Sequence, residues 1–304
     1  MCRVLAYIGE PVLLDDLLYK PDNSLVRQCY DPKMMAMLSL AGFGISAWDG
    51  ASHDPAIPFT YKTTSLPMFD QNLRQLSQKV RAHALIAHVR GVPYSEKSVV
   101  GLQNLHPFRF DGLPLAMAHN GDLSEFERMK FDLLEFVRPE IALRIHGSTD
   151  SEWIYALLIS QIPDPTAALR ASDIAVAAEK TLLIISEVRE RKGLRNHSPV
   201  NLFLCDGRNL VATRYTFDYG CYRDDPESIN VTYPSLWYTF GHQYGFRNGE
   251  WAMTGGIAHY DSVIIASEPL TRDVSTWLEV PEYSMLSISF DENSPGVTTV
   301  ALDL

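Results

Sequence analysis

A cysteine near the start of the chain could act as a nucleophile. Cys2 directly follows Met1, and cysteine is small enough for methionine aminopeptidase to expose it as the first residue of the mature protein. Such a residue carries a thiol and a free α-amine together, and an amine with a pKa of roughly 7.7–8.0 is a suitable base near neutral pH. Taken alone, Cys2 is more simply explained as a position that tolerates many side chains. Other functional residues are needed to identify it as a nucleophile.

Two charged residues occupy positions from which they could hold a substrate. Arg90 ends the apolar run 82–90, where a guanidinium must either be ion-paired or face a cleft and bind a carboxylate through two hydrogen bonds. Asp150 could receive an ammonium group, or it could simply stabilise the first turn of a helix. For Arg90, a structural salt bridge is the equally open alternative.

Two further segments hold polar groups suited to the same chemistry. Asn120 and Gly121 follow an apolar run; Asn-Gly is typical of a hairpin turn, but the Asn amide and a Gly N–H can also converge as an oxyanion hole. His106 precedes Pro107, and a hydrogen-bonded histidine in a rigid turn is the favoured interpretation. A role for His106 as an acid, a base or a substrate contact is the alternative.

Together these residues describe one site. A thiolate attacks an acyl carbon, two donors hold the oxyanion, a cation takes a carboxylate and an anion takes an ammonium group. A carboxylate and an ammonium on one carbon define an α-amino acid, and an amide farther out makes it glutamine or a γ-glutamyl compound.

The strands that must position this site are interrupted by a helical region. Runs of apolar residues predict buried strands at 4–9, 82–90 and 113–119, and the chain is β-rich again from residue 200 onward. Strands, then helices, then strands favour an α+β fold in which two sheets pack together with helices outside. Because no Gly/Ser- or Pro-rich linker divides the chain, we expect residues 1–304 to form a single domain.

The helices of the middle region carry recognisable ends. Thr149 and Glu152 have the spacing of a capping box. The longest helix is predicted to begin with Asp164 as N-cap and Pro165 in its first position, and to end before Gly193.

Composition excludes several classes of function. The 304 residues are 46% hydrophobic and 21% charged, with a formal net charge of −11, which disfavours binding to nucleic acids or anionic membranes. The four cysteines, which include Cys221, form no CxxC pair, and no HxH or HExxH motif is present, so we expect neither a metal nor another cofactor. Without a signal peptide or a transmembrane run, a cytoplasmic location is expected.

The motifs occur in an order that resembles the class II glutamine amidotransferases, which are N-terminal-nucleophile hydrolases with a four-layer αββα sandwich. The segments that carry the resemblance are Met1–Arg3, His88–Gly91, Asn104–Phe108, His119–Gly121 and Thr149–Glu152. The resemblance implies Cys2 as nucleophile with its own amine as base, and Asn120 and Gly121 as the oxyanion hole. It also implies Arg90 on the substrate carboxylate, Asp150 on the substrate ammonium, and His106 as a further substrate-binding residue.

The segment 263–270 and the residues beyond it resemble stand-alone members of this class, including glutathione-degrading and ergothioneine-pathway hydrolases of γ-glutamyl bonds. Ser267 and Glu268 are expected to mark a structural strand end. Two stretches depart from the family pattern. Residues 41–44 read Ala-Gly-Phe-Gly where Asp-Gly-Trp-Gly is common, and Gly-Val-Pro follows Arg90. These departures concern the identity of the substrate more than the reaction.

The sequence therefore predicts hydrolysis of the γ-amide of glutamine or a γ-glutamyl compound through a thioester on Cys2, releasing glutamate and ammonia or an amine. Too little chain follows residue 270 for a synthase domain, so any ammonia-accepting enzyme would be a separate partner protein. The alternative is a non-catalytic module that binds γ-glutamyl compounds with Cys2 blocked. A metal hydrolase is a weaker third hypothesis, because His83 and His88 lie on opposite faces of a predicted strand.

Overall fold

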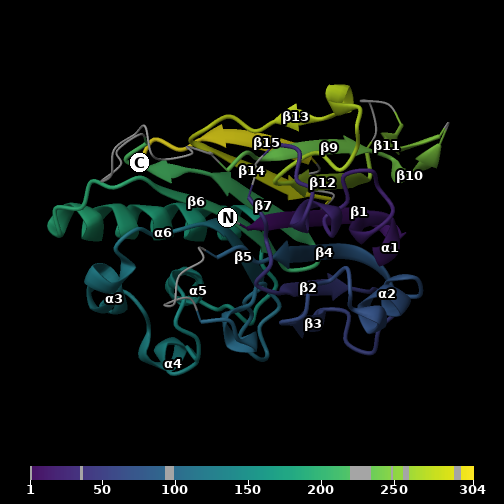
Figure 1. Cartoon of the computed structure of the whole chain (residues 1–304). Coiled ribbons are helices and arrows are strands. Elements are labelled where there is room, and N and C mark those ends of the chain that lie inside the picture. Colours follow the sequence, from purple (N-terminus) through teal and green to yellow (C-terminus); the bar gives the residue numbers. More distant parts are fainter. Residues whose placement is uncertain are drawn as a thin grey trace.

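Two antiparallel sheets form the centre of the molecule, which we describe from a computed structural model (Figure 1). The structure describes residues 2–34, 37–92, 99–219, 234–247, 249–255, 260–290 and 296–304. Three positions named from the sequence, Met1, Pro93 and Cys221, lie outside these residues.

Within this part of the chain the first sheet has seven strands, which are, in spatial order, β13 (Leu278–Glu279), β9 (Trp237–Gly241), β12 (Ser262–Ala266), β1 (Arg3–Leu13), β4 (Arg81–Val89), β2 (Phe43–Trp48) and β3 (Phe59–Thr63). The second sheet consists of β15 (Gly296–Ala301), β14 (Ser284–Ser289), β7 (Asn209–Arg214), β6 (Ser198–Cys205) and β5 (Ala116–Gly121), with β8 (Thr216–Phe217) paired to β6. A separate hairpin is formed by β10 (Gln243–Arg247) and β11 (Glu250–Thr254).

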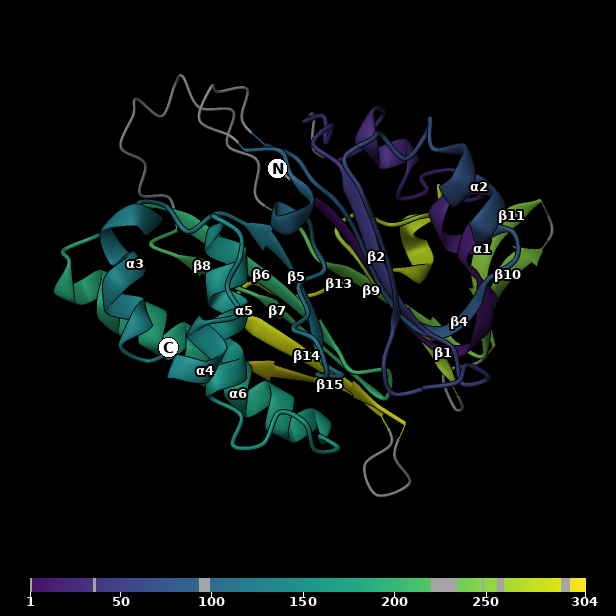
Figure 2. The same ribbon diagram turned by 90° about the horizontal axis from the view of Figure 1, so that it is seen from below.

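Helices cover the outer face of each sheet. Figure 2 shows α3 (Phe126–Leu134), α4 (Pro139–Ala142), α5 (Asp150–Ser160) and α6 (Ala171–Arg191) beside the second sheet. On the far side of the molecule, α1 (Leu14–Leu18), α2 (Gln71–Ser77) and the β10–β11 hairpin lie beside the first sheet. The four-layer αββα sandwich expected from the sequence is therefore confirmed.

The alternation of side chains along β1 explains how three cores hold these layers together. Val4, Ala6 and Ile8 face the core between the two sheets, whereas Leu5 and Tyr7 face the core under α1 and α2. Because both faces of β1 are buried, its sequence is a continuous apolar run. A third core joins α3–α6 to the outer face of the second sheet.

Pairing of β1 determines where the chain start lies. Arg3 pairs with Val89 of β4, and Phe43 of β2 also pairs with Val89. In an antiparallel pair the start of one strand meets the end of the other. The first residues of the chain therefore lie beside the segment that carries Arg90.

Several element boundaries differ from the predictions. The hairpin turn suggested by Asn120-Gly121 is wrong, because β5 continues through both residues and pairs Gly121 with Val200 of β6. The predicted start of the longest helix at Asp164 is also wrong. The Asp164 carboxylate instead accepts hydrogen bonds from Thr166, and α6 begins at Ala171.

The predicted capping box at α5 forms only in part. Thr149 accepts a hydrogen bond from the Glu152 backbone, as expected for an N-cap. The Glu152 carboxylate, however, accepts from the backbone of His146 and Gly147 instead of the N-cap residue. Glu152 thereby holds the loop that precedes α5.

Candidate active site

Cys2 lies at the entrance to β1 and is 7% exposed. Its Sγ lies 3.6 Å from the carbonyl oxygen of Gly91, in the segment that follows β4. Burial raises the pKa of the Cys2 thiol; the positive charge of Arg90 partly offsets this effect and the negative charge of Asp150 adds to it. The structure therefore brings Cys2, Arg90 and Asp150 into one electrostatic neighbourhood.

Arg90 is 8% exposed and is held mainly by its backbone. Its N–H donates to Gly42, its carbonyl oxygen accepts from Ala41, and its Nη1 donates to the carbonyl oxygen of Val99 at 2.8 Å. Among the described residues Arg90 makes no ion pair, so the structural salt bridge considered from the sequence is not observed there. Burial lowers the pKa of the guanidinium, and the charges of Cys2 and Asp150 oppose that shift. A guanidinium in this setting has N–H groups free for a carboxylate.

Asp150 is the first residue of α5, and its carboxylate contacts the segment that follows β5. Its Oδ2 accepts from the Leu123 N–H at 2.7 Å, and its Oδ1 accepts from the Ser151 backbone and hydroxyl. The Ser151 hydroxyl also lies 2.9 Å from Nδ1 of His119, whose Nε2 lies 3.4 Å from the carbonyl oxygen of Pro199. The carboxylate keeps acceptor capacity beyond these bonds, which an ammonium group can use.

Asn120 and Gly121 end β5 on the side of the second sheet nearest Cys2. Asn120 is fully buried; its Nδ2 donates to Ser267 Oγ at 3.1 Å, and its Oδ1 has no hydrogen-bond partner among the described residues. Nδ2 carries a second N–H that this contact does not use. At Gly121 a Cβ would lie 1.8 Å from the carbonyl oxygen of Pro199, so only glycine allows β6 to approach this closely.

Ser267 and Glu268 were not selected from the sequence, yet they contact the nucleophile strand. Ser267 Oγ accepts from the Val4 N–H at 3.0 Å as well as from Asn120. It therefore joins the strand that carries Cys2 to the amide expected in the oxyanion hole.

Glu268 forms a fully buried ion pair with Arg3, with 3.1 Å between Oε1 and Nε. Nη1 of Arg3 donates to the carbonyl oxygen of Cys2 at 3.1 Å, and Glu268 Oε2 accepts from the backbone of Lys33 and Met34. This network holds the backbone of Cys2 in place through its carbonyl oxygen. An acidic residue two positions after the end of the buried strand β12 was the available signal, but its partner is 265 positions away in the sequence.

His106 lies beside the site but is buried, with 3% exposed. Its ring stacks against His88, with 4.0 Å between centroids, and neither ring nitrogen of His106 has a hydrogen-bond partner in the described part of the chain. The expectation that His106 is hydrogen-bonded is therefore wrong within the described part of the chain. Burial lowers the pKa of both imidazoles well below the usual value, so both are neutral at pH 7. A role of His106 in substrate binding stays a prediction.

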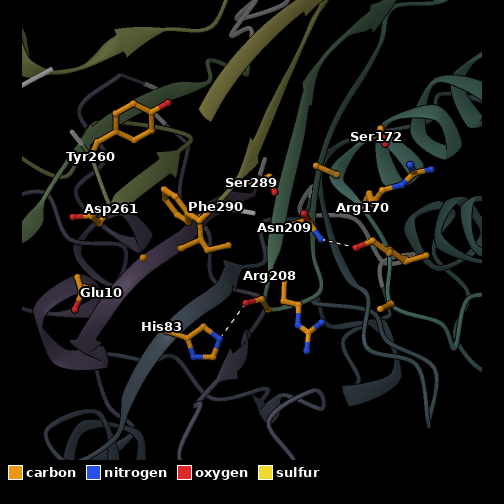
Figure 3. A pocket seen from close by; sticks show the side chains of 16 residues that line it. Glu10, His83, Arg170, Ser172, Arg208, Asn209, Tyr260, Asp261, Ser289 and Phe290 are labelled. Carbon is orange, nitrogen blue, oxygen red and sulfur yellow. Dashed lines mark hydrogen bonds between the residues drawn. The ribbon is translucent and has the colours of Figure 1, made fainter. Parts of the chain in front are cut away.

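A cavity of about 1240 Å³ is shown in Figure 3. It is lined by Glu10, His83, Arg208, Asn209 and Tyr260 among others, and by none of Cys2, Arg90, Asn120 or Asp150. Glu10 and Cys2 lie near opposite ends of β1, separated by roughly 25 Å of extended strand. The size of a cavity thus does not identify the site in this molecule. No group of three or more potential metal ligands was found among the described residues, and none of their helices is long and apolar enough to cross a membrane.

Comparisons with known proteins relate the chain to a family of enzymes. A family model described as "Glutamine amidotransferases class-II" matches residues 30–228. A probable glutamine amidotransferase of Saccharomyces cerevisiae, DUG3, is 29% identical over 310 residues, which is 95% of this chain and 82% of that protein. The gamma-glutamyl-hercynylcysteine sulfoxide hydrolase of Mycobacterium tuberculosis is 28% identical over 305 residues, 100% of this chain and 97% of the hydrolase. A solved glutamine aminotransferase class-II domain protein from Silicibacter pomeroyi is 20% identical, covers both chains fully and has a TM-score of 0.63.

Proposed function

The chain belongs to the class II glutamine amidotransferases, and on that basis we propose that it hydrolyses the γ-amide bond of glutamine or a γ-glutamyl compound through a thioester on Cys2. Membership of this family and similarity to a γ-glutamyl hydrolase indicate that the protein is an enzyme that acts on γ-amide bonds. The observation that carries the thioester proposal is the joint placement of Cys2, Arg90 and Asp150.

The first step is activation of the thiol. Removal of Met1 would free the α-amine of Cys2, which accepts the thiol proton as Sγ attacks the γ-carbonyl carbon. Because burial raises the pKa of this thiol, a standing thiolate is disfavoured and proton transfer must accompany the attack. The new bond is C–S, and the carbonyl electron pair moves onto oxygen.

The oxyanion formed in this way needs two donors. The second N–H of Asn120 Nδ2 and the backbone N–H of Gly121 are the groups we assign to it. The protonated amine then gives its proton to the leaving nitrogen as the C–N bond breaks. Water, activated by the same amine, hydrolyses the thioester and releases glutamate.

The glutamyl part of the substrate is held by opposite charges. We assign its α-carboxylate to Arg90 and its α-ammonium to Asp150, which have free donor and acceptor capacity, respectively. Two fixed charges at one end of the substrate orient the γ-carbonyl toward Cys2. The leaving group is chosen elsewhere, so glutamine, glutathione and other γ-glutamyl compounds all remain candidates.

The test is glutamate release from a panel of γ-glutamyl compounds by the wild-type protein and by Cys2→Ala. Cys29→Ala is a matched control, because Cys29 is also a buried free cysteine and belongs to the core under α1 and α2. We expect Cys2→Ala to abolish turnover and Cys29→Ala to retain it. Full activity of Cys2→Ala would eliminate the proposal. Intact mass decides whether the mature chain begins at Cys2, and retention of Met1 in an inactive protein would favour the binding-module alternative.

We also propose that residues 1–304 form one domain, because β1 pairs with β12 near the other end of the chain and both sheets share the inner core. A single cooperative unfolding transition is expected by calorimetry.

Whether the ammonia or amine is passed to a partner enzyme is tested by co-purification, and a stable acceptor-enzyme complex would favour transfer over simple hydrolysis.

A further inference from the structure

A smaller cavity of about 390 Å³ lies outside the proposed catalytic machinery. Neither Cys2 nor any of its assigned partners lines it. Its volume falls in the range of small-molecule sites, which is roughly 300–1,000 Å³. Its walls come from segments that are distant in sequence, including β3, the segment after His106, and the chain between α4 and α5.

Three cationic side chains meet at this cavity: Lys62, Arg109 and Arg144. None of them forms an ion pair within the part of the chain that the structure describes. Arg109 donates through Nη1 to the carbonyl oxygen of Leu113 at 3.1 Å, but its Nε is buried without a partner among the described residues. Arg144 donates through Nη1 to the carbonyl oxygen of Asp111.

The acidic groups on the same wall offset these charges only in part. Both oxygens of Glu152 are occupied by the backbone N–H groups of His146 and Gly147. Asp111 also lines the cavity, and its side chain is exposed. The cavity wall thus carries three cationic and two acidic side chains, and one of the acidic side chains, Glu152, also holds the loop before α5. Clustered, incompletely paired cations favour an anionic ligand.

Lys62 is partly buried at this cavity. Its Nζ lies 5.4 Å from the ring centroid of Phe108, and burial lowers its pKa to about 8, with Arg109 adding to the shift and Glu152 opposing it. A bound anion would relieve this cost. Phe108 and Phe110 supply an apolar surface on the same cavity, so the cavity offers contacts for more than a charged head group.

We propose that this cavity binds a small organic anion, with its phosphate or carboxylate group held by Lys62, Arg109 and Arg144 and its apolar body placed against Phe108 and Phe110. The site is separate from the one assigned to the γ-glutamyl substrate. The proposal does not depend on the reaction at Cys2.

The test is isothermal titration calorimetry of the full chain with phenyl phosphate, benzoate, inorganic phosphate and phenol. We expect saturable binding of at least one of the two ring-bearing anions, tighter than that of inorganic phosphate or phenol. Whichever of phenyl phosphate and benzoate binds more tightly shows whether the cavity prefers a phosphate or a carboxylate group. Lys62→Met and Arg144→Gln should each weaken it about tenfold or more, as loss of a charge-assisted hydrogen bond does.

Two matched variants locate the binding. Arg208→Gln removes an exposed arginine at the larger cavity, and Arg90→Gln removes the cation assigned to the substrate carboxylate; both should bind the probes as the wild type does. Arg144 is exposed, so its variant tests the proposal independently of Lys62→Met, and melting curves verify that both variants fold. Binding that is unchanged in Lys62→Met and Arg144→Gln, binding lost in Arg90→Gln, or no heat of binding with any probe would overturn the proposal.

Discussion

Ser267→Ala is the substitution that most directly probes how the nucleophile strand is joined to the oxyanion amide. Ser267 is 2% exposed. Its hydroxyl accepts hydrogen bonds from two donors, the Val4 N–H at 3.0 Å and Asn120 Nδ2 at 3.1 Å. Alanine removes the shared acceptor and changes little else in volume. Both donors stay buried, so water cannot readily replace the hydroxyl.

The magnitude follows from the two lost bonds. A buried donor left without an acceptor costs about 1–3 kcal/mol, so the loss of two acceptors should lower the free energy of unfolding by about 2–6 kcal/mol. Unfolding of 304 residues at about 2.1 cal/mol/K per residue gives an entropy of about 0.64 kcal/mol/K, which converts the loss into a Tm decrease of about 3–9 °C.

The same substitution should slow catalysis. Complete loss of one oxyanion donor costs about 10²–10³ in kcat, and an Asn120 amide that has lost its anchor should cost part of that, about tenfold or more. KM should change little, because Arg90 and Asp150 are untouched. Glutamate release as a function of substrate concentration separates the two parameters.

Ser262→Ala is the matched control. Ser262 is a buried serine at the other end of β12, and its hydroxyl accepts from the Glu10 N–H and donates to the carbonyl oxygen of His242. We expect a similar loss of stability there with kcat unchanged. If Ser267→Ala lowers kcat no more than Ser262→Ala does, the reasoning about Asn120 is refuted.

Three further substitutions test other parts of the structure. Arg90→Lys keeps the charge but loses the planar fork, so KM for glutamine should rise about tenfold or more with a smaller change in kcat, measured by initial rates; an unchanged KM would remove Arg90 from the substrate. Gly121→Ala places a Cβ 1.8 Å from the Pro199 carbonyl oxygen and should cost about 1–3 kcal/mol or more in urea unfolding, whereas Gly245→Ala, where a Cβ meets nothing within 4 Å, should not introduce a clash. Lys62 has a folded pKa of about 8 and an ordinary value of 10.5, so the unfolded chain binds more protons between these pH values and stability rises with pH across that window. Lys62→Met should abolish this rise and stabilise the protein at pH 7 by about 1–2 kcal/mol; an identical pH slope in both proteins would contradict the shift.

Local chemistry was enough to select the residues expected at the catalytic centre. Cys2, Arg90 and Asn120 each stand beside a run of apolar residues, and a polar group at the end of a buried strand must be paired or face a cavity. Asp150 follows an N-cap threonine, so its place at the start of a helix was also a local property. The structure brings Cys2, Arg90 and Asp150 together, while their roles stay predictions.

Boundaries that depend on a partner strand or a competing cap were not predictable in the same way. Asn120-Gly121 has the local preference of a turn, but pairing with β6 keeps it extended. Asp164 has the local preference of an N-cap, but it closes a turn with Thr166, and Asp173 caps the backbone of Arg170 instead. The edge strand β3 and the β10–β11 hairpin, which are partly exposed and polar, gave no clear pattern at all.

By itself, the sequence determined the α+β layering and the types of residue that could attack, polarise and hold a γ-glutamyl group, because these depend on side-chain chemistry and on the period of the apolar pattern. Only the tertiary structure decided that Ser267 and Glu268 support Cys2 and Asn120. It did so because β1 pairs with β12, a contact between opposite ends of the chain. No local preference specifies such a pairing, since it forms only when both sheets bury their shared core.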